Sequence, residues 1–324
     1  MKASHKLCAV LLTILLFALS AWAENLSVDC RKGIQKSAGF STITAAVAKI
    51  AQKAAHEALG PNTITVTGPC VENISIVSLD NLTLQASPLG ASISDASNGT
   101  LDTLLVGDSN RFALTGFTIN GSVDCVDNAV CRLQGNTIQN SQIGWGLRGS
   151  RSHVNSQSDN ISGNPSGFGV VVTNQSRAGL SDDTISNNGG GIVVRNGGFL
   201  VLAGISSTTQ VSNNAGHGVF AFSHSTVRLE VANITGNGGD GIRVQDGSAL
   251  RAEFAGPTVN NITGNRGAGV NLGDLSHAFF ANDGSMNITG NLGGKDVYCA
   301  GQFAATRNVT TVGGTTNCKE PNPE

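Results

Sequence analysis

Residues 233–242 read Asn-Ile-Thr-Gly-Asn-Gly-Gly-Asp-Gly-Ile, and residues 261–270 read Asn-Ile-Thr-Gly-Asn-Arg-Gly-Ala-Gly-Val. Both stretches share a branched aliphatic residue, two further residues and an asparagine, and then a glycine-rich turn and an apolar strand. The unit recurs through the C-terminal half with a mean spacing of 25 residues. Its last residues are Ser141, Asn164, Asn188, Asn214, Asn237, Asn265 and Asn291. Repetition at this period indicates a solenoid or a related repeat architecture.

Each repeat contains three short strands whose side chains alternate between an inner and an outer face. The inner positions of the strand after the glycines hold Leu147, Val170, Ile192, Val219, Ile242 and Val270. A second strand begins at a small residue, such as Ser152 or Ser176, and the third strand carries the branched aliphatic residue. One repeat cannot bury its own inner face. Stacking successive coils buries this face and pairs each strand in parallel with its copy, which predicts a parallel β-helix.

The repeated asparagine predicts a particular bend between coils. Asparagine tolerates a left-handed backbone, and its side-chain amide can donate a hydrogen bond to the asparagine of the next coil. Repeat length varies mostly between the Ser-headed strand and the third strand, as in Phe254–Asn260. We therefore expect loops to protrude at that point of the coil.

The pattern resembles the right-handed parallel β-helix repeat proteins, which are related in fold to pectate lyases. The resemblance covers roughly 60–318 and implies an all-β fold, a single-stranded right-handed parallel β-helix (solenoid) of about ten coils. The Ala-rich residues 41–59 predict a helix, with Ser41 or Thr42 as its cap. This helix would cover the open end of the solenoid and its unpaired strand edge. We expect an N-terminal segment over 24–60, the solenoid over 61–318 and a tail over 319–324.

The first residues have the features of a secretion signal. Lys2 and Lys6 precede the apolar run 9–19, and Ala21-Trp22-Ala23 fits the small-residue cleavage pattern. We therefore predict a signal peptide over 1–23 and a secreted, periplasmic or extracellular protein. Its removal leaves six cysteines, and an even number in an exported chain indicates disulfides. Six cysteines allow fifteen pairings, of which we favour the local set Cys30–Cys70, Cys125–Cys131 and Cys299–Cys318.

Composition excludes several classes of protein. The 324 residues include 42 Gly, 13% charged and 40% hydrophobic residues, with a net charge of −2. The apolar share is sufficient for a core, which argues against a disordered chain. Because no Lys/Arg run follows the N-terminus, we expect no nucleic-acid partner. No later stretch is long and apolar enough to span a bilayer, so we expect no membrane insertion. No cysteine has metal-ligand spacing, and we expect no metal site and no cofactor.

Two short motifs are similar to elements of polygalacturonases of the same fold. Asp182-Asp183 resembles their paired carboxylates, which would act as general acid and base, and Gly216-His217-Gly218 resembles their Gly-His-Gly. The upstream Asn-Thr-Asp is missing, and Arg243-Val244-Gln245 stands in place of Arg-Ile-Lys. His217 also occupies a repeat position that other coils fill with other residue types. We expect a bend there and assign no catalytic residue.

Lyases and epimerases of this fold use a basic residue to take a proton beside a uronate carboxylate. No Lys lies between 54 and 294, so an Arg would have to serve. Asp246 and Asp274 hold equivalent bend positions and could offer oxygen ligands to a cation. The same position holds Asn or Ser in other coils, which favours turn hydrogen bonding.

Charged and aromatic side chains gather at two sets of outward positions. The strand after the glycines projects Arg148, Arg195, Phe220, Phe222, Arg243 and Gln245, and the Ser-headed strand projects Arg228, Glu230, Arg251 and Glu253. Aromatic rings stack on sugars and arginine binds carboxylates bidentately, so these are candidate glycan-binding residues. For the second set the alternative is a solvated ion ladder that adds little stability. For Phe220 and Phe222 the alternative is cover by a loop or by a partner chain.

Three classes of function remain open. The first is a secreted protein that binds extracellular or cell-surface polysaccharide through an outward strand face. The second is a carbohydrate-active enzyme, a polysaccharide lyase, epimerase or hydrolase, for which the fold alone is weak warrant. The third is a structural or adhesive surface protein without a glycan ligand.

Overall fold

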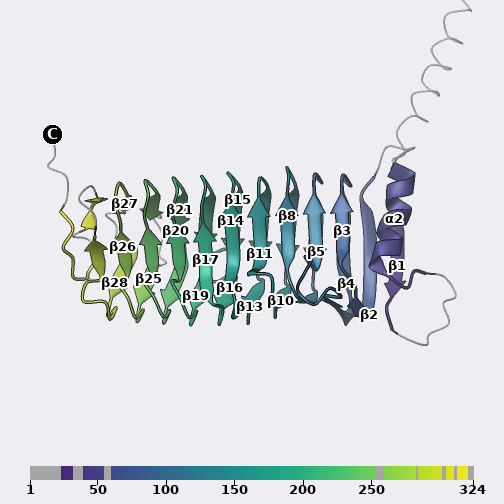
Figure 1. Cartoon of the computed structure of the whole chain (residues 1–324), viewed down its shortest axis with the longest axis horizontal. Helices are drawn as coiled ribbons and strands as arrows, with labels where there is room; N and C mark the ends of the chain where they lie inside the picture. The colour runs from purple at the N-terminus through teal and green to yellow at the C-terminus, as the bar shows by residue number, and fades with distance from the viewer. Residues whose placement is uncertain are drawn as a thin grey trace, which may run out of the picture.

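The chain winds into the expected right-handed parallel β-helix, with one helix at its N-terminal end (Figure 1). The computed structural model describes residues 23–31, 39–54, 60–252, 259–281, 284–300, 304–309 and 312–319. The expected signal peptide, apart from Ala23, lies outside these residues, as do Glu253 and the loop 254–258. No helix in the described ranges combines the length and apolar character needed to cross a bilayer.

One side of the solenoid is a ten-stranded sheet in which each strand pairs in parallel with its copy in the next coil. Its strands are β3 (Ile74–Val77), β5 (Leu104–Gly107), β8 (Val123–Val126), β11 (Trp145–Ser150), β14 (Phe168–Thr173), β17 (Gly190–Val194), β20 (Val219–Ala221), β23 (Ile242–Val244), β26 (Val270–Leu272) and β29 (Val297–Cys299). These are the strands that follow the glycines in the repeat.

The other side is a twenty-stranded sheet made of two parallel arrays that share β1 (Asn25–Asp29), β2 (Asn62–Val71) and β4 (Leu82–Ser94). The Ser-headed array contains β6 (Phe112–Thr115), β9 (Val130–Gln134), β12 (His153–Gln157), β15 (Arg177–Ser181), β18 (Phe199–Ala203), β21 (Thr226–Leu229), β24 (Ala249–Ala252), β27 (His277–Phe280) and β30 (Ala305–Arg307). The Ile array contains β7 (Thr118–Asn120), β10 (Thr137–Gln139), β13 (Asn160–Ser162), β16 (Thr184–Ser186), β19 (Thr209–Ser212), β22 (Ala232–Thr235), β25 (Asn260–Thr263) and β28 (Met286–Thr289).

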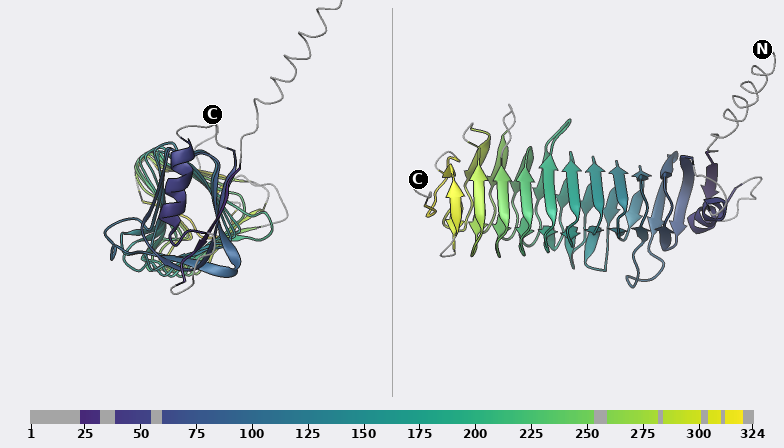
Figure 2. Two further views of the ribbon diagram at one scale, coloured as in Figure 1. Left: turned by 90° about the vertical axis from the view of Figure 1, so that its right-hand side faces the viewer. Right: turned by 90° about the horizontal axis from the view of Figure 1, so that it is seen from above.

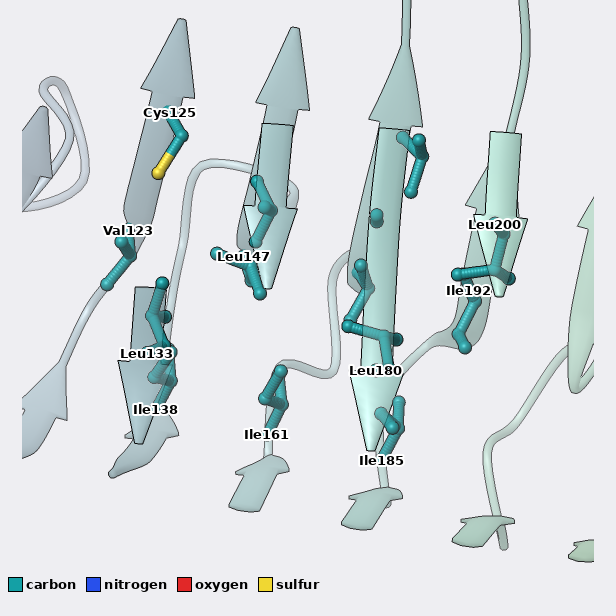
Figure 3. Packing of buried hydrophobic residues seen from close by; sticks show 14 of the residues in the cluster. Val123, Cys125, Leu133, Ile138, Leu147, Ile161, Leu180, Ile185, Ile192 and Leu200 are labelled. Atoms are coloured by element: carbon teal, nitrogen blue, oxygen red, sulfur yellow. The ribbon is translucent and has the colours of Figure 1, made fainter. Parts of the chain in front are cut away.

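The core is a set of aliphatic columns along the solenoid axis. Leu147 and Ile192 point inward from the ten-stranded sheet, Leu180 from the Ser-headed array and Ile161 and Ile185 from the Ile array (Figure 3). Each of these side chains is at most 1% exposed. Burial of such a side chain contributes about 1.5–3 kcal/mol, so the repeated inner positions supply most of the driving force for stacking.

The asparagine bend is partly as expected. Nδ2 of Asn188 donates to Oδ1 of Asn214 at 3.0 Å and to the carbonyl of Ile161 at 3.1 Å, and the other coils repeat this ladder. The expectation of a left-handed backbone at these asparagines was wrong. The positive φ falls one residue earlier, as at Asn187 (57°) and Asn213 (55°). The buried asparagine hydrogen-bonds to polar groups of the neighbouring coils. The exposed residue before it adopts the left-handed backbone that turns the chain.

The N-terminal end is closed by a helix, as predicted. Helix α2 (Ile43–Ala54) lies across the first coil (Figure 2) and buries Ile43, Val47 and Ile50 against it. Thr42 caps the helix, because its hydroxyl accepts the Ala45 amide at 3.2 Å. The strand β1 before the helix was not predicted, and it adds a further parallel strand beside β2.

Three disulfides join the expected pairs. Cys30–Cys70 ties β1 to β2, Cys125–Cys131 joins β8 to β9, and Cys299–Cys318 holds the C-terminal segment against β29. Disulfides of this kind persist in oxidising compartments, so they fit a secreted or extracellular protein.

Candidate functional site

A cluster of aromatic and charged side chains stands on the outer face of the ten-stranded sheet at β20 and β23. The rings of Phe220 and Phe222 stack at 4.8 Å between centroids, and the Arg243 guanidinium lies 5.8 Å from the Phe220 centroid. Phe220 and Arg243 are paired across adjacent strands, which places them side by side. Both phenylalanines stay partly exposed, and no described loop covers them completely. The structure thus brings together three of the candidate residues.

His217 joins this cluster from the bend before β20. Its ring lies 5.6 Å from that of Phe220, and its Nδ1 accepts the Asp240 backbone N–H at 2.9 Å. This bond leaves the proton of a neutral imidazole on Nε2. Burial lowers the pKa of His217, and Arg243 adds to the effect while Asp240 opposes it. His217 is therefore a neutral hydrogen-bond donor near pH 7, beside a stacked aromatic pair.

The neighbouring outward positions extend the cluster. By strand register, Arg195 and Gln245 occupy the same column as Phe222, one coil before and one coil after it. Gln245 Oε1 accepts a hydrogen bond from Arg243 Nε at 3.2 Å, which leaves the terminal nitrogens of this guanidinium for other partners. Arg195 is exposed. The combined surface offers aromatic rings and cationic donors to a ligand.

A second cluster lies three coils earlier on the same sheet, around Trp145. Arg148 donates through Nε and Nη2 to the carboxylate of Asp124, with the Nε contact at 2.8 Å, and its guanidinium lies 3.9 Å from the Trp145 ring centroid. The indole N–H of Trp145 donates to Oδ1 of Asp102 at 3.2 Å. Asp124 is fully buried. Burial raises the pKa of Asp124 to about 6, because desolvation and the nearby Asp102 outweigh the hydrogen bonds from Arg148.

This second cluster borders a hollow of about 420 Å³. Its lining includes Asn73, Ser75, Thr100, Leu101, Asp102, Leu105, Ile143, Trp145 and Arg148. One wall is the loop 95–103 between β4 and β5, which leans over the short turn at Gly121. A Cβ at Gly121 would lie 1.8 Å from Thr103 Oγ1, so only glycine permits this approach. A volume of this size suits a small ligand or one unit of a polymer.

The loops that form this hollow do not lie at the point of the coil where the sequence predicted protruding loops. The sequence predicted protrusion before the Ile array, and the loop 204–208 lies there. The walls of the hollow instead come from 95–103 and 140–144, which precede strands of the ten-stranded sheet.

Asp182 and Asp183 have structural roles. The Asp182 carboxylate accepts the amides of Ile205, Ser206 and Ser207 at 2.8–3.1 Å and so holds the loop 204–208. Asp183 is fully buried, and its Oδ1 accepts the Asp159 amide at 2.7 Å. Its other oxygen has no hydrogen-bond partner in the described part of the chain. Burial and the neighbouring Asp159 raise the pKa of Asp183 to about 8. A group without solvent access cannot contact a substrate.

The candidates of the Ser-headed array lie apart from both clusters. Arg228 and Glu230 form an ion pair at 3.3 Å along one strand, and Arg251 stacks on Arg228 in the next coil. Glu253 lies outside the described residues. Among the described residues this is a single partly exposed ion pair, and such pairs add little stability.

Most residues of the second cluster, around Trp145, were not predicted from the sequence. Arg148 was a candidate, but Asp102, Asp124 and Trp145 were not. Trp145 contacts Asp102 across 43 residues, and the irregular repeats before residue 135 gave no register from which to place them together. The available signal was the rarity of tryptophan, because the chain has only two.

One group within the described ranges has metal-ligand spacing, namely Cys30, Cys70 and Glu72. The two sulfur atoms are joined in a disulfide. The Glu72 carboxylate accepts the Ile43 and Thr44 amides at the start of α2. These three residues therefore close the solenoid end.

Comparison with known proteins agrees with the architecture. Residues 115–284 match the family model described as "Right handed beta helix region". This range is more than half of the chain, which therefore belongs to the right-handed β-helix family. A comparison with curated protein sequences gives no match.

Two solved structures are similar to the chain. The Azotobacter vinelandii Mannuronan C-5 epimerase AlgE4 A-module has a TM-score of 0.48 and 14% identity, and the alignment covers 88% of this chain and 92% of that one. The AlgE6 A-module from the same organism has a TM-score of 0.45 and 15% identity, covering 82% and 85%.

Proposed function

We propose that this chain binds extracellular or cell-surface polysaccharide along the outer face of its ten-stranded sheet. The observation that supports this most directly is the stacked pair Phe220–Phe222 with Arg243 beside it. Exposed rings stack on the apolar faces of sugars, and arginine and histidine N–H groups donate to their hydroxyl or carboxylate oxygens. The three groups occur together at β20 and β23.

The ligand we expect is a polymer, because the clusters around Trp145 and Phe220 both lie on the outer face of the ten-stranded sheet. The Trp145 cluster and the Phe220 cluster are separated by three coil steps, from β11 to β20. At about 4.8 Å for each step, the separation is about 14 Å. A chain of several sugar units running along the solenoid axis would reach both clusters, and simultaneous contact raises affinity.

The test is affinity electrophoresis of the secreted chain on acidic and neutral polysaccharides, followed by sizing of the glycan. The double variant Phe220→Ala/Arg243→Ala should lose retardation and keep its melting temperature. The matched control is Phe279→Ala/Arg307→Ala. It removes a similar pair on the Ser-headed array, in which the Arg307 guanidinium lies 5.7 Å from the Phe279 ring centroid. Unchanged retardation of the first variant would contradict the site.

The same experiment separates the other two classes of function. A shortened glycan would establish cleavage and replace binding by lyase or hydrolase activity. If the glycan stays intact, a further measurement of uronate stereochemistry distinguishes an epimerase, which would alter it, from a binding protein. No retardation on any polysaccharide would favour a structural or adhesive protein.

A further inference from the structure

The hollow beside Trp145 carries charges that favour a cationic ligand. Asp102 lines it and accepts hydrogen bonds from the Trp145 indole at 3.2 Å and from the Ser122 hydroxyl at 2.9 Å. Arg148, the one cationic side chain in the described lining, already donates two bonds to Asp124. An anionic ligand would face the Asp102 carboxylate and a guanidinium whose charge is already paired with Asp124.

A further carboxylate strengthens the negative potential. Asp95 lies in an adjoining hollow that shares Leu101 and Ile143 with the first. Burial opposes its ionisation, but hydrogen bonds from Ser97, Asn73 and Gly99 lower the pKa of Asp95 to about 2. It is therefore ionised at physiological pH. Asp95 and Asp102 thus line the two adjoining hollows, whereas the charge of Arg148 is paired with Asp124, and a cation bound beside Asp102 gains Coulomb energy.

The remaining lining suits a sugar ring. Leu101, Leu105 and Ile143 give apolar walls, whereas Ser75 and Thr100 give hydroxyl groups at the rim. A pyranose has apolar faces and a rim of hydroxyl groups, which matches this distribution. The wall is also held in place, since the Asn73 amide donates to the carboxylate of Asp95 at 2.7 Å and to the Asp102 carbonyl at 2.9 Å.

We propose that this hollow binds an amino-sugar unit of a polysaccharide, with the protonated amine beside Asp102 and the ring against the apolar walls. The inference rests on the proposed function for the polymer and adds the class of sugar. It does not depend on the residues of the Phe220 cluster.

Trp145 fluorescence reports directly on the hollow. The sequence has two tryptophans, and the other, Trp22, lies in the expected signal peptide. The secreted chain is titrated with a β-1,4-linked glucosamine tetramer and, separately, with its N-acetylated form, which has the same length and no charge. The glucosamine tetramer should bind at least about 10-fold more tightly below the pKa of its amines, and the difference should vanish above it.

Asp102→Asn keeps the oxygen that accepts the Trp145 and Ser122 bonds but removes the charge. This variant should bind both tetramers equally. Asp274→Asn is the matched control, because it removes an exposed turn carboxylate seven coils farther along than Asp102, and it should keep the preference.

Equal binding of the two tetramers by the unmodified chain, or a preference that survives Asp102→Asn, would overturn the amino-sugar site. If other polysaccharides were still retarded in a Phe220-dependent manner, the proposed function would stand. If no glycan bound at all, the proposed function would fail and this site with it.

Discussion

The side-chain amide of Asn188 donates to the side-chain oxygen of Asn214 at 3.0 Å, one coil farther along the solenoid. The same Oδ1 accepts the Asn188 backbone amide at 3.0 Å. Asn214 in turn donates to the carbonyl of Ile185 and to Oδ1 of Asn237. A single residue thus satisfies polar groups in three coils, inside a core where unsatisfied groups are costly.

Replacing Asn214 by Ala should destabilise the fold by about 3 kcal/mol, because buried polar groups on both neighbouring coils lose their hydrogen-bond partner. Asn213→Gly is the matched control. Asn213 is exposed with a φ of 55°, and glycine holds the equivalent position in other coils, as at Gly236. It should change stability by less than about 0.5 kcal/mol. Guanidinium unfolding of both variants measures the difference, and equal stabilities would contradict the ladder's role.

The repeated part of the fold could be predicted from sequence because each coil solves the same packing problem. Inner positions such as Val170, Ile192 and Val219 align in register, and each is at most 1% exposed. The buried asparagine ladder followed from its spacing. The backbone angle was assigned to the wrong residue, since sequence shows that a bend contains Asn but not which of two adjacent residues turns.

The candidate sites were predictable to unequal degrees. Phe220 and Arg243 lie in regular repeats, so counting residues places them on one face. The partners Asp102 and Trp145 meet because a loop of coil-specific length leans across Gly121. No periodicity encodes that approach.

Asp183 should make the protein less stable as pH rises. Burial and Asp159 raise its pKa to about 8, and that of Asp159 is raised to about 6, mainly by burial. The folded state therefore holds more protons than the unfolded state between about pH 4 and pH 8. The free energy of unfolding should fall across this window and level off above it. Chemical denaturation at pH 4.5, 6, 7.5 and 9 measures the slope.

Asp183→Asn should flatten this slope and stabilise the protein at pH 8 by an amount on the order of 2 kcal/mol. The amide fits, because Asn136 and Asn260 accept the same type of backbone hydrogen bond in other coils. Asp182→Asn is the matched control, because it makes the same chemical change at the preceding residue. It should instead loosen the loop 204–208, since the Asp182 charge accepts three backbone amides. A steeper slope in Asp183→Asn would refute the assignment.

The two N-terminal disulfides should differ in their effect on stability. Cys30–Cys70 closes a separation of 40 residues and Cys125–Cys131 one of 6. In the chain-entropy model these loops correspond to about 4 and about 2 kcal/mol. Paired Cys→Ser variants compared by thermal unfolding test the order. Hydrogen exchange should also show that loss of Cys30–Cys70 releases β1 first, whereas uniform loss of protection would argue against local tethering.

Arg148→Ala should destabilise the fold by about 3–5 kcal/mol, because Asp124, which is fully buried in the folded chain, loses its only cationic partner among the described residues. The pKa of Asp124 is already raised to about 6 by burial and by Asp102, and removal of the guanidinium raises it further. The folded state then binds the proton more tightly, so the loss of stability should be larger at pH 8 than at pH 5. Adding Asp124→Asn should recover stability at pH 8. Arg195→Ala, on the same face but exposed, should have little effect at either pH. If Arg148→Ala cost the same at both pH values, its contribution would come from packing on Trp145 and not from the charge of Asp124.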